Sequence, residues 1–174
     1  MKTQHHRQNV RMLCRTALLC ALLCILSVIT VPVGAVPVTL GLLGVLLCGL
    51  LLPPGNACIA VFGYLLLGAV GLPVFSSMQG GIGVLFGITG GFLWGYPIAA
   101  LLVSIARTSG RVPTMLGLLG APICCYLPGT AVYCAVTQST PAAALTACVL
   151  PFLIPDLCKC VLAWMLFRRL RHRL

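Results

Sequence analysis

Apolar residues fill six long runs of this chain, and short segments rich in glycine, proline or polar residues separate the runs. A helix needs about 20 apolar residues to cross the roughly 30 Å hydrocarbon core of a bilayer. The pattern therefore predicts an all-α integral membrane protein, a bundle of six transmembrane helices. Their expected ranges are about Arg15 to Thr30, Thr39 to Leu52, Asn56 to Gly71-Leu72-Pro73, Gly90 to Ile105, Pro113 to Gln138 and Pro141 to Arg169.

The separating segments define one membrane domain, residues 1–174, with a basic tail at each end, 1–14 and 168–174. "VPVGAVP" follows the first helix, and the glycine-rich "VFSSMQGGIGVLFGITGG" lies between the third and fourth. The second helix is short for a full crossing, and the fifth contains "LPGT". Both are expected to be tilted, broken or partly covered by protein.

Composition supports a membrane protein. Mean hydropathy is +1.13 and charged residues make up 7%, against about a quarter in soluble domains. The net charge of +10 is compatible with nucleic-acid binding, but the basic residues flank apolar runs and no soluble recognition module accompanies them. Lipid headgroups are the expected partner of this charge.

The positions of the basic residues predict the orientation of the chain. Ten of the eleven form three clusters, before the first helix, between the fourth and fifth, and after the sixth: Lys2, Arg7, Arg11, Arg15, Arg107, Arg111, Arg168, Arg169, Arg171 and Arg173. Cytoplasmic segments are enriched in Lys and Arg, and six passes bring all three clusters to one side. We therefore expect both termini in the cytoplasm and a multi-pass protein of the cell membrane.

Two alternative features are less consistent with the pattern. A basic start, an apolar run and the small residues "VGA" at 33–35 imitate a cleaved signal peptide, but removing the first helix would leave five passes with basic clusters on both sides. The 11 cysteines lack paired CxxC spacing, and the histidines lie in the tails. We expect these cysteines to pack inside helices, with no metal, cofactor or redox role.

Asp156 is the only acidic residue, and it lies in the last apolar run, three residues before Lys159. This spacing places both side chains on one helix face, where each compensates the charge of the other. Ionisable groups in membranes are costly and usually mark a site; the alternative is an ion pair that only locks the helix to its neighbours. Pro151 and Pro155 remove amide donors and free backbone carbonyls, which favours one wall of a polar ligand site. On an unbroken helix, Asp156 would lie about 20 Å from the outer end.

The glycine-rich segment is expected to form the second wall of this site. Its glycines let backbone approach a ligand closely, and small-molecule pockets combine apolar walls with a few polar groups. The alternative is that these glycines only permit tight helix packing. The candidates are Gly80, Gly81, Gly83, Gly87, Gly90, Gly91, the aromatic residues Phe75, Phe92, Trp94 and Tyr96, and the polar residues Gln79 and Thr89.

Three segments carry a family resemblance: "PVTLGLLGVLLCGLLLPPGNA" (37–57), "YLLLGAVGLPVFSSMQGGIGVLFGITGGFLWGYPIAA" (64–100) and "LPFLIPDLCK" (150–159). In their order and spacing they resemble the BioY family, the biotin-specific substrate-binding (S) subunits of energy-coupling-factor (ECF) transporters. That family has GLPVF, a glycine-rich loop, GPTGGYLxGFPxAA and a late PFLPGDLxK. The likeness covers nearly the whole chain.

The resemblance implies a six-helix S-component bundle that captures biotin from the outer side. It implies that Asp156 accepts hydrogen bonds from the ureido N–H groups, and that Lys159 balances this charge or donates to a ligand oxygen. Aromatic side chains would pack on the fused ring. Gln79, Thr89 or loop amides would hold the ligand carboxylate.

The chain departs from the family pattern at four places, which together comprise five residues. Gly41 replaces a common Gln, Ile88 a Pro, Phe92 a Tyr, and Ile154-Pro155 a Pro-Gly pair. Losing the Tyr hydroxyl and the Gln removes two polar contacts. The ligand is therefore expected to be biotin held more weakly, or a relative of biotin.

The resemblance also implies partners, because the chain lacks a GxxxxGK[ST] phosphate-binding loop. These are a transmembrane coupling subunit and two ABC-type ATPases that use ATP, docking on small residues of the first helix. Ala17 and Ala21, four apart in "ALLCA", would let a partner helix approach closely; internal packing is the alternative for such a pair.

Other function classes remain open at this point. An enzyme is not expected, because one carboxylate and one lysine provide neither paired acids nor a nucleophile with its base. A structural or pore-forming bundle would bind no saturable ligand. A subunit for a different vitamin would keep the fold and change the pocket.

Overall fold

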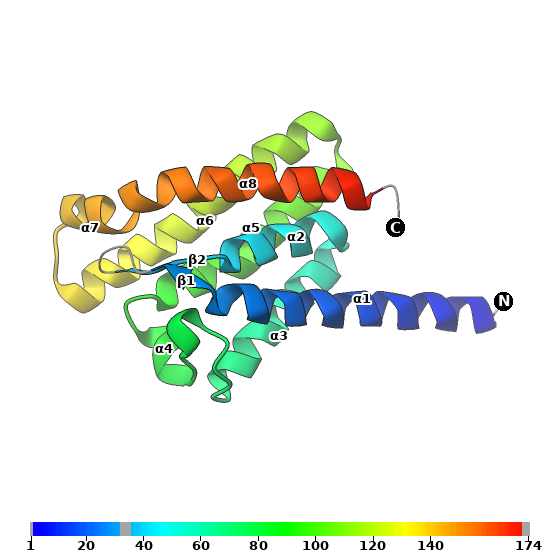
Figure 1. The fold of residues 1–174 in the computed structure, drawn as a ribbon, viewed down its shortest axis with the longest axis horizontal. Helices are drawn as coiled ribbons and strands as arrows, with labels where there is room; N and C mark the ends of the chain where they lie inside the picture. Colours follow the sequence, from blue (N-terminus) through cyan, green and yellow to red (C-terminus); the bar gives the residue numbers. More distant parts are fainter. Residues whose placement is uncertain (1, 32–35, 172–174) are drawn as a thin grey trace.

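The computed structural model describes residues 2–31 and 36–171, and helices account for most of them (Figure 1). In chain order the elements are α1 (Lys2–Val28), β1 (Thr30–Val31), β2 (Val38–Thr39), α2 (Gly41–Leu51), α3 (Pro54–Ala69), the 3₁₀ turn η1 (Ser76–Met78), α4 (Ile82–Phe86), α5 (Gly90–Thr108), α6 (Arg111–Thr137), α7 (Pro141–Cys148) and α8 (Leu150–Leu170). Each of the six predicted segments forms a helix: α1, α2, α3, α5, α6, and α7 together with α8.

α1 is longer than predicted. It begins at Lys2 instead of Arg15, so most of the segment expected to be a tail continues the first helix. No glycine or proline interrupts the chain between Lys2 and Val28, and these are the residues that most strongly stop a helix. The "VGA" at 33–35 lies outside the described residues, as does Arg173.

A short antiparallel hairpin, which the apolar pattern did not predict, joins α1 to α2. Thr30 pairs with Thr39, and Val31 pairs with Val38. Val36 and Val38 are buried against Cys148 of α7 and Phe152 of α8. The hairpin therefore packs the α1–α2 connection against the junction between α7 and α8.

The last predicted helix is divided in two. Val149, at φ −115° and ψ −50°, separates α7 from α8. Pro151 explains the division, because it lacks an N–H and its ring would clash with the carbonyl four residues earlier in a continuous helix. In the first turn of a new helix, however, proline is well tolerated. Asp156 consequently lies six residues from the start of α8, about 9 Å along its axis, instead of the expected 20 Å or so.

Helix α2 lies in the centre of the bundle. Every residue from Gly41 to Leu50 is buried, and α2 contacts α1, α3, α5, α6 and α8. This surrounding protein explains how an 11-residue helix can be apolar on all its faces. The expectation that the short second helix is covered by protein is confirmed.

Glycines bring α5 and α6 into close contact. A Cβ atom added at Gly95 would lie 2.6 Å from the Cys124 carbonyl oxygen, and one added at Gly91 would collide with the Pro128 carbonyl. Helix α6 stays continuous through its internal prolines, although Pro122 has no N–H for the Leu118 carbonyl. The thiol of Cys160 on α8 donates to that carbonyl at 3.1 Å, so α8 compensates for the missing backbone hydrogen bond.

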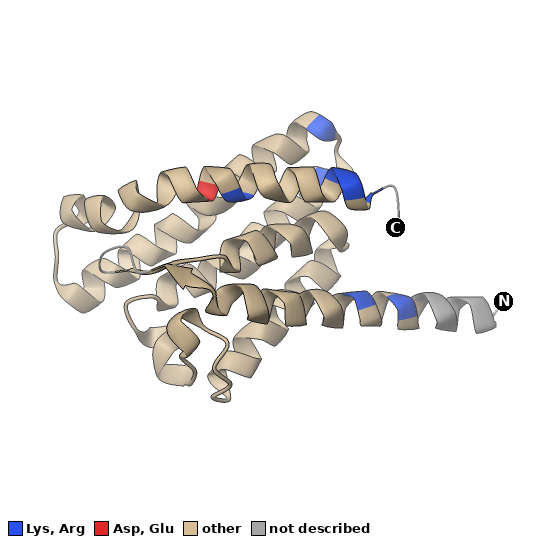
Figure 2. Ribbon diagram, viewed as in Figure 1, with Lys and Arg blue, Asp and Glu red and all other residues tan. Residues whose placement is uncertain are grey.

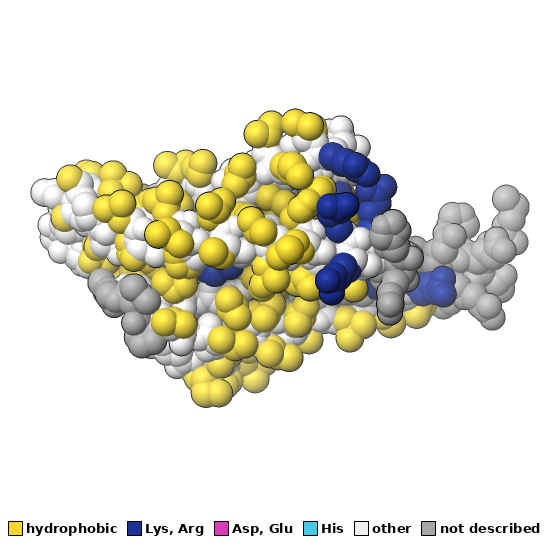
Figure 3. Space-filling model, turned by 45° about the horizontal axis from the view of Figure 1, so that its top comes forward, with side chains coloured by type: hydrophobic (Ala, Val, Ile, Leu, Met, Phe, Trp, Pro, Cys, Tyr) yellow, Lys and Arg dark blue, Asp and Glu magenta, His cyan; other side chains and the backbone are white. Residues whose placement is uncertain are grey.

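The surface has the composition expected in a bilayer. Among the described residues, α5, α6, α8 and residues Asn9–Val28 of α1 are long and apolar enough to cross a membrane, and α2 and α3 are shorter apolar helices. Apolar side chains cover much of the visible face in Figure 3, and most of the basic side chains gather at one end. Figure 1 places the start of α1 and the end of α8 at the same end of the bundle. This is the arrangement that six passes require, while its assignment to the cytoplasm stays a prediction.

The α5–α6 contact can be tested with Gly95→Ala. Because the added methyl meets backbone that cannot move aside, we expect overpacking to cost about 1–3 kcal/mol and to lower the unfolding temperature in detergent. Gly55→Ala is the control, since nothing lies within 4 Å of a Cβ at that position. Equal unfolding temperatures for the two variants would contradict the close contact.

Candidate functional site

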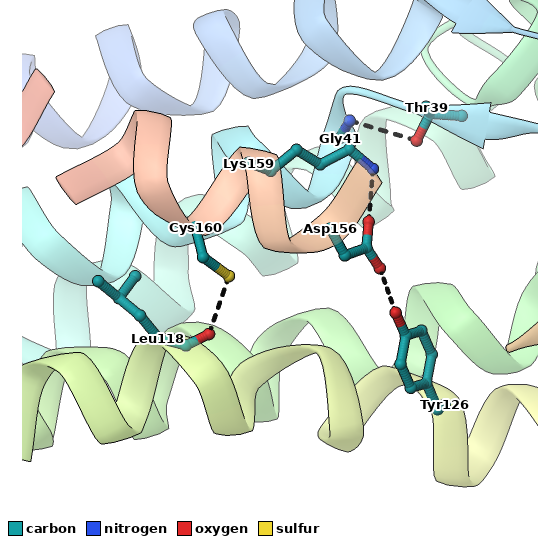
Figure 4. Close-up of polar contacts among 7 residues, drawn as sticks. All are labelled: Thr39, Gly41, Leu118, Tyr126, Asp156, Lys159 and Cys160. Atoms are coloured by element: carbon teal, nitrogen blue, oxygen red, sulfur yellow. Dashed lines mark hydrogen bonds and ion pairs between the residues drawn. The ribbon is translucent and has the colours of Figure 1, made fainter. Parts of the chain in front are cut away.

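The single carboxylate of the chain is held between two helices. Asp156 on α8 accepts a hydrogen bond from Lys159 Nζ to Oδ1 at 2.6 Å. It accepts a second from the hydroxyl of Tyr126 on α6 to Oδ2, also at 2.6 Å (Figure 4). Asp156 and Lys159 are 3% and 5% exposed. The pair is thus removed from solvent, and its opposite charges compensate each other inside the bundle.

A pocket opens beside this ion pair and is enclosed by almost every major element. About 60 Å³ of its interior is wide enough to hold water, and the whole hollow contains about 600 Å³ when the open solvent at its mouth is counted. The lining residues are Ser27 of α1, Val36, Pro37 and Thr39 of the hairpin, Leu42 of α2, Tyr64 of α3, Ser76 of η1, Thr89, Phe92, Leu93 and Tyr96 at α5, Cys125 and Tyr126 of α6, and Phe152, Asp156 and Lys159 of α8.

Aromatic rings form two walls of the pocket. Phe92 and Phe152 are stacked with centroids 6.1 Å apart and planes at 20°. Tyr64 and Tyr96 are also stacked, at 6.3 Å and 27°. Such flat apolar surfaces suit a ring system, and the tyrosine hydroxyls add polar groups at their edges.

Ser27 indicates that the pocket is built for a polar occupant. Its hydroxyl oxygen is buried, and within the described part of the chain no hydrogen bond of regular geometry reaches it, although the Tyr64 hydroxyl lies close by. A buried hydroxyl without a partner costs about 1–3 kcal/mol and calls for an explanation. The position of Ser27 in the pocket lining provides one, because a ligand or water there can complete the hydrogen bond.

The structure brings together five of the predicted site residues. Asp156, Lys159, Thr89, Phe92 and Tyr96 all line the pocket. Gln79 and Gly80 instead line a neighbouring recess, the loop recess. This recess shares Pro37, Ser76 and Thr89 with the pocket, so the two spaces adjoin each other.

The remaining predicted residues lie outside the pocket lining. Phe75 is fully buried and packs edge-on against Tyr64 at 5.5 Å, supporting the pocket wall from behind. Gly90 and Gly91 are close to backbone of Leu85 and of α6, as the packing alternative proposed. Gly81 has φ +102° at the start of α4, a conformation that glycine adopts without strain.

Several pocket residues escaped the sequence analysis. They lie in four different helices and the hairpin, far apart in sequence: Ser27, Tyr64, Tyr126, Phe152 and Thr39. The signal that could have identified Tyr126 is its place in an apolar run, where a buried phenol needs a hydrogen-bond partner.

Gly41, where the family commonly has Gln, lies beside the pocket. A Cβ added there would be 2.6 Å from Ser27 Oγ and 3.0 Å from the Tyr96 hydroxyl. The Gly41 amide donates to Thr39 Oγ1 at 3.2 Å. Hydroxyl groups of this chain therefore occupy the region around the position from which a Gln side chain would start.

Ala17 and Ala21 lie apart from the pocket, on α1. Both are exposed, together with Leu18, Leu22 and Ile25. Within the described bundle, no neighbouring helix covers this stripe of small residues, which does not fit the internal-packing alternative.

A helical membrane bundle with an aromatic pocket beside a buried, charge-compensated ion pair is the architecture of a solute-binding membrane protein. The chain belongs to the BioY family, whose profile matches residues 1–174. It is 36% identical over 155 residues to "Probable biotin transporter BioY" of Pyrococcus horikoshii, covering 89% of this chain and 93% of that protein. It is 35% identical over 153 residues to "Biotin transporter BioY" of Rhodobacter capsulatus, covering 79% and 80%.

A solved structure supports the same conclusion. The crystal structure of the S-component for biotin from an ECF-type ABC transporter superimposes with a TM-score of 0.88 at 26% identity, covering 95% of this chain and 93% of that one. The predictions of an all-helical membrane bundle and of BioY membership are confirmed. So is the prediction of a membrane transporter component in place of an enzyme.

The ion pair can be tested by a double-mutant cycle. Lys159→Met leaves the Asp156 carboxylate buried with Tyr126 alone, and breaking a buried pair in this way costs about 3–5 kcal/mol. Adding Asp156→Asn removes the remaining charge, so we expect the double variant to recover most of the loss. Thermal unfolding in detergent measures the stability of the single and the double variant. A double variant less stable than Lys159→Met would argue against the pairing.

Proposed function

We propose that this chain is the substrate-binding subunit of a biotin importer: it captures biotin from the outer side of the membrane and delivers it with an ATP-driven ECF module. The observation that carries the proposal is the buried Asp156–Lys159 pair, bound by the half-buried Tyr126, at the wall of an aromatic pocket. The names of the related proteins support biotin as the ligand.

The hydrogen-bonding capacity of the ion pair suits a ureido group. A carboxylate offers about four acceptor positions, and the protein occupies two of those of Asp156. The two that remain match the two N–H donors of the ureido ring. Lys159 has three N–H donors and uses one on Asp156, so another is available for the ureido oxygen.

The aromatic walls suit the fused rings of biotin. We assign Phe92 and Tyr96 to packing against the ring system, with Phe152 behind Phe92. Tyr126, Tyr96, Tyr64 and Ser27 supply hydroxyls to the same pocket. These groups compensate for the hydroxyl that Phe92 lacks relative to the family Tyr, and they favour biotin itself over a relative.

The acyl chain of biotin would extend toward the loop recess. Thr89 and Ser76 line both spaces, and Gln79 and Gly80 lie beyond them. No arginine is among the residues that line the pocket or the loop recess. We therefore assign the ligand carboxylate to neutral donors, the Thr89 hydroxyl, the Gln79 amide and backbone N–H groups around Gly80 and Gly81.

Transport requires partners for energy. We propose that α1 binds a transmembrane coupling subunit through Ala17 and Ala21, because small exposed residues allow close helix contact. A pair of ABC-type ATPases would then supply ATP hydrolysis. In this arrangement the basic end of the bundle, with both termini, faces the cytoplasm.

Biotin binding tests the ligand and its site together. For purified wild-type protein in detergent we expect saturable binding of labelled biotin. A hydrogen bond to a charged group contributes about 1.5–3 kcal/mol, so Asp156→Asn should weaken binding at least tenfold. Tyr126→Phe, which keeps both charges, should weaken it by a smaller factor because Asp156 loses one of its two partners.

The controls separate the site from the fold. Tyr133→Phe makes the same change on the same helix outside the pocket, and should leave affinity unchanged. Gel filtration confirms that each variant is folded. A folded Asp156→Asn protein with wild-type affinity would show that Asp156 is not part of the site. If another vitamin bound to the protein and biotin did not, that vitamin would be the ligand.

The docking face is tested by Ala21→Trp. The large ring should block close approach of a partner helix, so we expect biotin uptake by cells carrying the ECF module to fall at least tenfold while biotin binding by the isolated subunit is unchanged. Ala131→Trp, an exposed alanine on α6, is the matched control. Normal uptake with Ala21→Trp would place the docking surface elsewhere.

A further inference from the structure

A second large recess lies at the basic end of the bundle, away from the biotin pocket. It contains about 1210 Å³ of space, counting its open side. Four arginines line it, Arg15 of α1, Arg107 at the end of α5, Arg111 at the start of α6, and Arg171 after α8. We call this space the arginine recess. Figure 3 shows basic side chains gathered at this end.

No carboxylate side chain of this chain can compensate the charge of the recess. Asp156 is the only acidic residue among 174, and it is bound to Lys159 and Tyr126 in the other pocket. Arg107 Nε is also buried, without a hydrogen-bond partner among the described residues. The enrichment of cytoplasmic segments in basic residues explains why arginines lie at this end. It does not explain why arginines from four helices line the same recess.

The chemistry of the recess suits a phosphate group. Guanidinium groups present several N–H donors in a planar fork and bind phosphate oxygens in pairs. Trp164 and Phe167 of α8 line the same recess, with ring centroids 5.9 Å apart. Tryptophan side chains such as Trp164 are enriched where hydrocarbon meets headgroups.

The surroundings of the recess favour a lipid over a soluble anion. Next to Arg111 on α6, Val112 and Met115 are 68% and 46% exposed, so apolar surface begins directly beside the arginines. An acyl chain can lie on that surface while its phosphate lies in the recess. Basic pockets between transmembrane helices are suited to anionic headgroups.

We propose that the arginine recess binds the phosphate of an anionic phospholipid, such as phosphatidylglycerol. One bound headgroup would connect α1 to α5, α6 and α8 at the end where the bundle lacks internal counter-charge. Arg15 lies two residues before Ala17. The lipid would therefore fix the helix that carries the proposed docking face.

The test uses Trp164 as a reporter within the recess. Trp94 is the other tryptophan of the chain, so the full-length Trp94→Phe protein in lipid nanodiscs has one fluorescent indole. Brominated phosphatidylglycerol diluted in phosphatidylcholine should quench Trp164 more strongly than brominated phosphatidylcholine diluted in phosphatidylglycerol. The ratio gives the preference for the anionic lipid.

Matched charge changes locate the binding site. Arg107→Gln and Arg111→Gln should each lower the preference about fivefold, as expected for the loss of about 1 kcal/mol per basic residue. Arg169→Gln removes the same charge at the same end but does not line the recess, and should change the preference less than twofold. Biotin binding in each variant confirms folding. Arg111 is exposed, so Arg111→Gln still tests the recess if Arg107→Gln destabilises the protein.

Three outcomes would overturn the proposal. The first is quenching that depends equally on Arg169 and Arg107, which would indicate general surface charge. The second is displacement of brominated phosphatidylglycerol by inorganic phosphate, which would indicate a soluble anion. The third is absence of lipid preference together with loss of ECF-module binding in Arg111→Gln, which would assign the recess to acidic residues of a partner subunit.

Discussion

The need to neutralise one carboxylate inside a membrane-spanning helix organises much of this molecule. Asp156 receives Lys159 from its own helix and Tyr126 from α6, so α8 and α6 must be aligned at this point. The Cys160 thiol makes a second link between the same helices a few residues later. Polar contacts therefore fix how α8 lies on the bundle, where apolar packing alone would leave alternatives in rotation or depth.

Close packing elsewhere leaves room for the pocket at that point. Glycines let α5 and α6 touch backbone to backbone, and α2 fills the centre with a helix buried on every side. Beyond α2, the hairpin and the segment around Ser76 cover the space between α1, α5 and α8. The lining of the pocket thus combines helices with two short connections, the hairpin and the segment around Ser76.

Sequence patterns predicted the helices and the ion pair, because both depend on local spacing. Apolar runs located α2, α3, α5 and α6, and three-residue spacing placed Asp156 beside Lys159. Contacts across long sequence separations could not be found in this way. Tyr126 is 30 residues from Asp156, and nothing local indicates which tyrosine reaches it. Glycine motifs were ambiguous for a related reason: Gly80 lies at a recess and Gly91 in a helix contact, although both belong to one glycine-rich segment.

The charge compensation at Asp156 and Lys159 also has an electrical consequence. A group that moves one elementary charge across a membrane works against the potential, at about 2.3 kcal/mol per 100 mV. The paired side chains carry no net charge, so the membrane potential exerts almost no net force on the pocket itself. The unpaired charges lie at the basic end of the bundle (Figure 2). A rearrangement that opens the pocket while the basic end stays in its own leaflet would move almost no net charge across the membrane. Its rate would therefore not depend on the membrane potential.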